Sequence, residues 1–166
     1  MVLGNLNKLQ LLVLSGNELT GSVPDSIFNM SALQILMFGQ NKLSSTLPSD
    51  LGRGTPNLEK FLCGGNNLSG FISNSISKSS KLRIFEFVVN SFSGPIPKSL
   101  GDLENLEFLN LERNNFISDL SLSFLTSLTN CRKLRVLRFG VNPLDGVLPA
   151  SVGNLSKYLK KIEGDC

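Results

Sequence analysis

Apolar residues recur along the chain in one frame that ends on an asparagine. Successive marker asparagines are 24, 25, 24, 24 and 28 residues apart, and apolar residues stand eight, five and three positions before each of them. The frame reads L-x-x-L-x-L-x-x-N, with Phe or Cys in place of some leucines. The six markers are Asn17, Asn41, Asn66, Asn90, Asn114 and Asn142. Six copies in phase indicate an internally repeated architecture.

The frame predicts one short strand in each repeat. Its fourth and sixth positions, such as Leu12 and Leu14, are two residues apart and therefore point to the same face of a strand. Stacked repeats would place these strands in a parallel sheet. The marker asparagine stands where the chain leaves the strand, and its amide can both donate and accept hydrogen bonds. We therefore interpret the six asparagines as a structural column, named here the asparagine ladder, that pairs with backbone groups of the turn.

A second motif, L-x-G-x-[I/V/L]-P, follows the asparagine. Residues 17–24, 90–97 and 142–149 carry it well, residues 41–48 and 66–73 carry weaker copies, and residues 114–121 have lost both Gly and Pro. Glycine permits turn dihedrals that are closed to other residues, and proline ends strand pairing. The motif thus predicts a short second strand followed by a bend.

Together the two motifs resemble the plant-specific class of leucine-rich repeat, over essentially the whole chain. The resemblance implies an α/β solenoid: a right-handed leucine-rich-repeat superhelix with a parallel concave β-sheet, short second strands, and 3-10 or short α-helices on the convex side. This class typically builds the ectodomains of receptor-like kinases and receptor-like proteins, and secreted cell-wall proteins such as polygalacturonase inhibitors.

The frame predicts a single repeat array over residues 1–166. A partial repeat covers residues 1–8, repeats start near positions 9, 33, 58, 82, 106 and 134, and a partial repeat covers residues 159–166. An uncapped solenoid end exposes a cross-section of its core. The paired-cysteine cap that the family resemblance leads us to expect is missing, so we expect the chain to be a fragment whose parent holds any membrane or kinase segment.

The longest repeat predicts a helix instead of the Gly/Pro turn. In residues 119–128 an apolar face would carry Phe124, Leu125 and Leu128, with Leu120 or Ser121 one turn earlier. Asp119 or Ser121 could cap this helix. Residues 122–131 resemble the long mid-array repeat of the receptor-kinase subfamily that senses flagellin and elongation-factor peptides.

Composition argues against catalysis. The chain has no His, three Cys without zinc spacing, and a net charge of only +3. We therefore expect no catalytic residue, no metal, no cofactor and no nucleic-acid partner. No apolar run is long enough to span a bilayer, so we expect no direct membrane insertion, and the first residues lack the features of a targeting signal.

Side chains that point out of the concave sheet are the candidate ligand contacts. The first three repeats offer apolar residues beside glycines, and the last three add charged residues. The candidates are Val13, Met37, Leu62, Glu86, Val88, Asn110, Glu112, Arg113 and Arg138. An apolar strip that grades into mixed charge suits an extended peptide. The alternative is that these residues only satisfy the strand preference for β-branched and aromatic side chains.

Three N-glycosylation sequons occur, which is close to the number expected by chance. Asn29 and Asn154 are the better acceptors, since Asn67 lies next to the asparagine ladder.

The resemblance implies a peptide- or protein-binding fragment of the extracellular ligand-sensing domain of a plant receptor-like serine/threonine kinase, in defence or development. The parent would stand in the plasma membrane, with this segment on the extracellular side, and would recruit a co-receptor kinase. A secreted polygalacturonase-inhibitor-like protein and a truncated, non-signalling gene product remain the alternatives.

Overall fold

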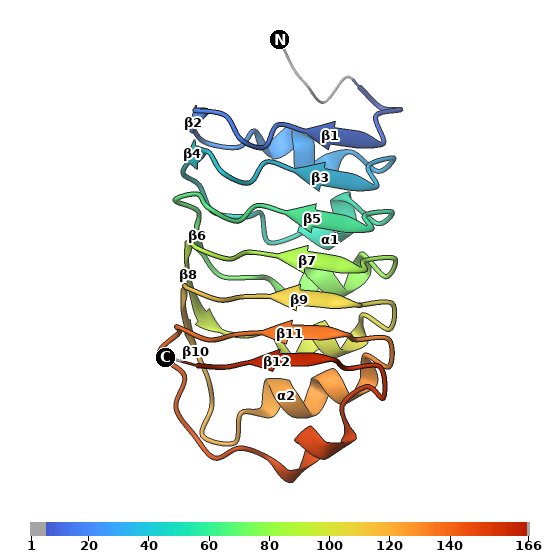
Figure 1. Ribbon diagram of the computed structural model, residues 1–166. Coiled ribbons are helices and arrows are strands. Elements are labelled where there is room, and N and C mark those ends of the chain that lie inside the picture. The colour runs from blue at the N-terminus through green and yellow to red at the C-terminus, as the bar shows by residue number, and fades with distance from the viewer. Residues whose placement is uncertain (1–5, 166) are drawn as a thin grey trace.

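The computed structural model describes residues 6–165, which coil into a solenoid. In Figure 1 the coils stack along one axis, with a ladder of strands on one face and short helices behind it. Residues 1–5 of the predicted partial repeat 1–8, and Cys166 at the other end, lie outside the described residues.

One parallel sheet runs the length of the array. Its seven strands pair in the order β1-β3-β5-β7-β9-β11-β12, so every neighbour is the equivalent strand of the next coil. They are β1 (Leu11–Val13), β3 (Ile35–Met37), β5 (Lys60–Leu62), β7 (Ile84–Glu86), β9 (Phe108–Asn110), β11 (Val136–Arg138) and β12 (Lys161–Glu163). Equivalent frame positions are paired, for example Phe61 with Phe85. The period of the sequence is therefore also the register of the sheet.

Shorter strands and helices complete each coil. The second strands are β2 (Thr20–Gly21), β4 (Lys42–Leu43), β6 (Ser69–Gly70), β8 (Ser91–Pro95) and β10 (Asn115–Ile117). The 3-10 helices are η2 (Asp25–Asn29), η3 (Asn74–Lys78), η4 (Lys98–Asp102), η5 (Leu128–Asn130) and η6 (Ala150–Asn154). The α-helices are α1 (Leu51–Gly54) and α2 (Ser123–Ser127). Two smaller parallel sheets lie beside the main one (Figure 1). One consists of strands β2 and β4, and the other of strands β6, β8 and β10.

A column of phenylalanines fills the middle of the core. Seven of them are almost fully buried: Phe28, Phe38, Phe61, Phe85, Phe87, Phe92 and Phe116. The ring centroids of Phe61 and Phe87 are 5.1 Å apart, and those of Phe85 and Phe87 are 4.2 Å apart. The Phe61–Phe87 contact joins two neighbouring coils, whereas Phe85 and Phe87 belong to the same coil, so the column ties the central coils together.

The asparagine ladder joins the coils at the strand ends. Asn66 Nδ2 donates to the carbonyl of Cys63 in its own turn (3.0 Å) and to that of Phe38 in the preceding coil (3.1 Å). Its Oδ1 accepts from the backbone N–H of Leu43 (3.0 Å). The same three-way bonding recurs at Asn41, Asn90, Asn114 and Asn142. Asn17 donates only to carbonyls of its own turn, those of Leu14 and Ser15.

The second strands differ from the expectation in the longest repeat and the one after it. Strand β10 pairs with β8 although residues 114–121 have lost Gly and Pro. Residues 142–149 keep both, yet they form no strand. Their backbone meets the preceding coil through a Val147 N–H bond to Leu120 O (2.8 Å) and through contacts between Ser118 and Asp145. A second strand thus forms only where the preceding coil offers a strand in register. The longer loop before α2 shifts the preceding coil out of register with residues 142–149.

The helix of the long repeat starts later than its pattern predicts. Leu122 adopts a left-handed conformation (φ 45°), and α2 begins at Ser123. Asp119 Oδ1 accepts from the backbone N–H of Ser123 (2.9 Å) and from Ser121 Oγ (3.1 Å), so Asp119 performs the capping. The three predicted face residues Phe124, Leu125 and Leu128 are buried, whereas Leu120 is 76% exposed. Leu120 cannot join the helix face because the turn at Leu122 separates it from the helix.

Replacing Asn66 with Ala should strongly destabilise the solenoid. Asn66 is 7% exposed, and its removal leaves the Leu43 N–H without its partner and takes one of two asparagine donors from the carbonyls of Phe38 and Cys63. Because an unsatisfied buried N–H costs about 1–3 kcal/mol and each further lost hydrogen bond about 0.5–1.5 kcal/mol, we expect a loss of about 3 kcal/mol in the free energy of unfolding, measured by urea denaturation. Asn17→Ala is the matched control, since Asn17 is exposed and bonds only its own turn. Equal losses in the two variants would contradict the bridging role of the ladder.

Candidate ligand-binding groove

The outward side chains of the main sheet form two rows on the concave face. In most strands the middle residue is buried in the core, and the residues on either side of it are partly exposed, as in β3, β5, β7 and β11. Val13 on β1 is 52% exposed. The alternation follows from the strand geometry, which turns successive side chains to opposite faces.

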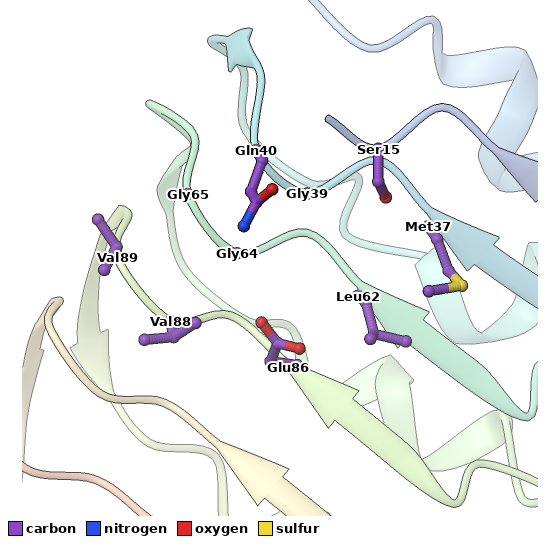
Figure 2. A pocket seen from close by; sticks show the side chains of 10 residues that line it. All are labelled: Ser15, Met37, Gly39, Gln40, Leu62, Gly64, Gly65, Glu86, Val88 and Val89. Atoms are coloured by element: carbon purple, nitrogen blue, oxygen red, sulfur yellow. The ribbon is translucent and has the colours of Figure 1, made fainter. Parts of the chain in front are cut away.

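A shallow pocket of about 340 Å³ lies where β3, β5 and β7 end. Figure 2 shows the residues around it. Its lining consists of Ser15, Met37, Gly39, Gln40, Leu62, Gly64, Gly65, Glu86, Val88 and Val89. Four of the candidate contacts, Met37, Leu62, Glu86 and Val88, are thereby brought together in one site.

The pocket exists because glycines occupy positions where other repeats carry side chains. A Cβ added to Gly64 would lie 2.5 Å from Glu86 Oε1 and 2.7 Å from Val88 Cγ1. A Cβ added to Gly39 would lie 2.9 Å from the carbonyl oxygen of Gly64. A larger residue at either position would displace its neighbours, so the glycines let the Glu86 carboxylate lie over the chain at Gly64, as Figure 2 shows.

Glu86 is the acidic group of this pocket. Burial raises the pKa of its carboxyl, and the positive charge of Arg138 opposes that rise only in part. Within residues 6–165, no Lys or Arg nitrogen forms an ion pair with the Glu86 carboxylate. Glu86 is thus a half-buried carboxylate on an otherwise largely apolar surface.

The charged candidates nearer the C-terminal end neutralise one another. Arg138 Nε lies 2.7 Å from Glu163 Oε2, and Lys161 Nζ lies 2.6 Å from Glu163 Oε1. Glu112 Oε2 lies 3.8 Å from Arg138 Nη1. Glu112 and Arg138 therefore belong to an ion-pair network across β11 and β12, outside the pocket.

Asn110 differs from the expectation that it contacts a ligand. Its side chain is 4% exposed, and its Oδ1 accepts from the backbone N–H of Glu112 (3.0 Å). In the sheet register it stands between Glu86 and Arg138, whose side chains are longer. The short amide thus folds back on its own backbone, and the candidate contact is corrected to a structural residue. Val13 and Arg113 are exposed and do not line the pocket.

Of the residues at the eighth repeat position, only Arg113 was among the candidate contacts, whereas Gln40 and Val89 line the pocket beside Gly65. The position is left-handed throughout: Gly16 and Gly65 have φ of 71° and 70°, and four other residues have φ between 53° and 56°. Those four are Gln40, Val89, Arg113 and Val141. The sequence signal that could have identified these pocket residues is that the eighth position mixes Gly with larger residues. For a β-branched residue this conformation is strained.

Both preferred sequons lie on the outer side of the solenoid. Asn29 ends η2 and Asn154 ends η6, and both side chains are exposed. Ser31 of the first sequon is exposed as well, whereas Ser156 of the second is buried and donates to the carbonyl of Arg132 (2.7 Å).

Cys63 and Cys131 are free and buried, and burial raises the pKa of both thiols, that of Cys131 to about 12. Thiols held so far from the thiolate form act as core residues. Residues 6–165 hold no group of three or more His, Cys, Asp or Glu side chains that could bind a metal ion. None of the helices in this described part of the chain could span a bilayer.

Comparison with known proteins agrees with this architecture. Residues 8–30 match the family model described as Leucine Rich Repeat. The chain is 51% identical over 61 residues to a probable LRR receptor-like serine/threonine-protein kinase of Arabidopsis thaliana, and 48% identical over 61 residues to the receptor kinase-like protein Xa21 of Oryza sativa subsp. japonica. Each alignment covers 36% of this chain and 6% of the relative.

Solved receptor ectodomains share the fold over nearly the whole chain. The Arabidopsis thaliana receptor kinase HAESA ectodomain, in complex with an N-terminally extended IDA peptide hormone, superposes with a TM-score of 0.85 at 28% identity. The match covers 95% of this chain and 26% of that ectodomain. The chain is therefore a leucine-rich-repeat solenoid similar to plant receptor-kinase ectodomains, and it spans about a quarter of the HAESA ectodomain.

Replacing Val89 with Asn should stabilise the protein. Left-handed backbone costs an ordinary L-residue about 1–2 kcal/mol, and Asn tolerates it better than Val. Val89 is 47% exposed, so little burial is lost, and we expect a gain of about 1 kcal/mol in urea unfolding. Gly65→Val is the matched reverse change, because a Cβ there meets nothing closer than 3.5 Å. Gly65→Val should lower the free energy of unfolding. If neither variant changes stability, the left-handed backbone at this position is not strained for Val.

Replacing Glu86 with Gln should stabilise the protein in a pH-dependent way. The pKa of Glu86 is raised in the folded state, so folding disfavours its ionised form. The stability that the protonated form supplies is present below the usual pKa and is lost as pH rises through the folded pKa. The advantage of Glu86→Gln should therefore grow between about pH 4 and pH 7 in urea titrations.

Glu104→Gln, on an exposed residue, is the control for this pH dependence. An advantage of Glu86→Gln that stays constant with pH, or that shrinks toward pH 7, would contradict the burial of the Glu86 charge.

Proposed function

We propose that this chain is a peptide-binding segment of the extracellular ligand-sensing domain of a plant receptor-like serine/threonine kinase that acts in defence or development. The observation that carries the proposal is the pocket at the ends of β3, β5 and β7. There, apolar side chains and bare glycine backbone meet on the concave face. An extended peptide needs both features, because its side chains require pockets and its backbone requires close approach.

The similar proteins support this role. Two are receptor kinases or receptor-kinase-like proteins, and the similar HAESA ectodomain is in complex with a peptide hormone. The 28-residue repeat with its short helix α2 supports a place in the subfamily that senses flagellin and elongation-factor peptides.

In this proposal the chain is one stretch of a longer repeat array. The parent receptor would hold it on the extracellular side of the plasma membrane, carry the kinase domain elsewhere, and recruit a co-receptor kinase. Asn29 and Asn154 would carry glycans, since both amides stand exposed on the side of the coils away from the concave sheet.

Removing the apolar wall of the pocket should weaken peptide binding. Random 12-residue peptides displayed on phage would be selected on the immobilised chain, and the affinity of the selected peptides would be measured by fluorescence anisotropy. The double variant Met37→Ala/Leu62→Ala removes apolar contact area, and we expect binding to weaken about tenfold, which corresponds to about 1.4 kcal/mol.

Lys78→Ala is the control for this experiment, because Lys78 is exposed on η3, away from the pocket. Peptides whose affinity responds to Lys78→Ala but not to the double variant would place binding on the convex side and refute the proposal.

A further inference from the structure

The three glutamates on the outward rows of the last strands and turns are not equivalent. Glu163 pairs with Arg138 and Lys161, and Glu112 pairs more loosely with Arg138. Glu86 forms no ion pair with any residue of the described chain, and Arg138, whose charge influences it, is already ion-paired with Glu163. A negative charge is thus left without a counter-charge in the pocket at the ends of β3, β5 and β7.

The surroundings of Glu86 suit a long cationic side chain. Met37, Leu62, Val88 and Val89 supply apolar walls, and no Lys or Arg lines the pocket. Lysine and arginine bury their apolar stems along such walls while the charged head meets a carboxylate. Partial burial strengthens the attraction between opposite charges, because the effective dielectric constant is lower there than in water.

Two other occupants fit less well. A purely apolar side chain would complete the burial of Glu86 and leave its charge without a partner, which is costly. An anionic group would meet the Glu86 carboxylate without any cation in the lining to offset the repulsion.

We propose that this pocket binds an arginine or lysine side chain of the peptide ligand, with the Glu86 carboxylate as its counter-charge and the walls at Leu62 and Val88 as the seat of its stem. The inference rests on the proposed function, since it names the chemistry of the peptide that the concave face binds. It also gives a reason for keeping an unpaired carboxylate in a position where folding alone disfavours it.

The test is a double-mutant cycle between Glu86 and the selected peptides. Peptides selected from the random 12-residue library on the unaltered chain should be enriched in Arg or Lys at one position. Replacing that residue with norleucine should weaken binding to the unaltered chain at least tenfold and should change binding to the Glu86→Gln variant less than twofold. The pKa of Glu86, followed by carbon-13 NMR of its carboxyl, should fall when the peptide binds.

Glu104→Gln is the matched control, since it makes the same chemical change on an exposed residue that does not line the pocket. A double-mutant cycle between Glu104→Gln and the norleucine substitution in the peptide should show no coupling. Glu86→Gln retains the size of the side chain, and its urea unfolding reports directly whether the variant is folded.

The failures of the two proposals are distinguishable. Selected peptides that depend on Met37 and Leu62, but show neither enrichment in cations nor coupling to Glu86, overturn the cation pocket and leave peptide binding intact. Selected peptides that ignore Met37 and Leu62 overturn the proposed function and the cation pocket together.

Discussion

Each coil of this solenoid leaves backbone groups unpaired where its strand ends, and the next coil must supply their partners. A buried N–H or C=O without a partner costs more than a typical hydrogen bond returns, so this requirement fixes how coils stack. Asn66 meets it by bonding one carbonyl in its own turn and two backbone groups of the coil before it. Because these bonds hold neighbouring turns at a fixed spacing, the strands pair in register and the phenylalanine rings of neighbouring coils pack against one another.

The same constraint separates the structural positions of a repeat from the variable ones. Frame leucines, core phenylalanines and ladder asparagines pack on or bond to the neighbouring coil, whereas the outward residues near the pocket form no ion pair with it; the exceptions on the outward rows are the ion pairs of Arg138 with Glu112 and Glu163. Those rows can therefore change from repeat to repeat without disturbing the stack. The pocket arises from such a change, because Gly39, Gly64 and Gly65 remove side chains from three adjacent positions while the backbone course stays the same.

The sequence was sufficient to predict what depends on period and polarity. The frame predicted the strands, the buried face and the parallel stacking, because the spacing of apolar residues determines all three. It did not predict that Asn110 is buried, since its bond to the backbone N–H of Glu112 depends on its own conformation and not on its place in the repeat. The missing strand at residues 142–149 depends on a neighbour that the long loop displaced, and a local motif contains no information about that neighbour.

The site carries two features that folding alone would not favour. Val89 is a β-branched residue held in a left-handed conformation at the rim, and Glu86 is a carboxylate whose charge is partly buried without a counter-charge in the described chain. Strain and unpaired charge of this kind persist where the surrounding structure over-determines the backbone, and here the asparagine ladder and the phenylalanine column do so. Equivalent positions of other coils hold Gly65 in place of Val89 and the paired Glu163 in place of Glu86, which shows that the repeat itself requires neither feature. Val141 is a β-branched residue in the same conformation that does not line the pocket, so the strain at Val89 is not specific to this site, whereas a ligand that neutralises Glu86 would account for the unpaired charge there.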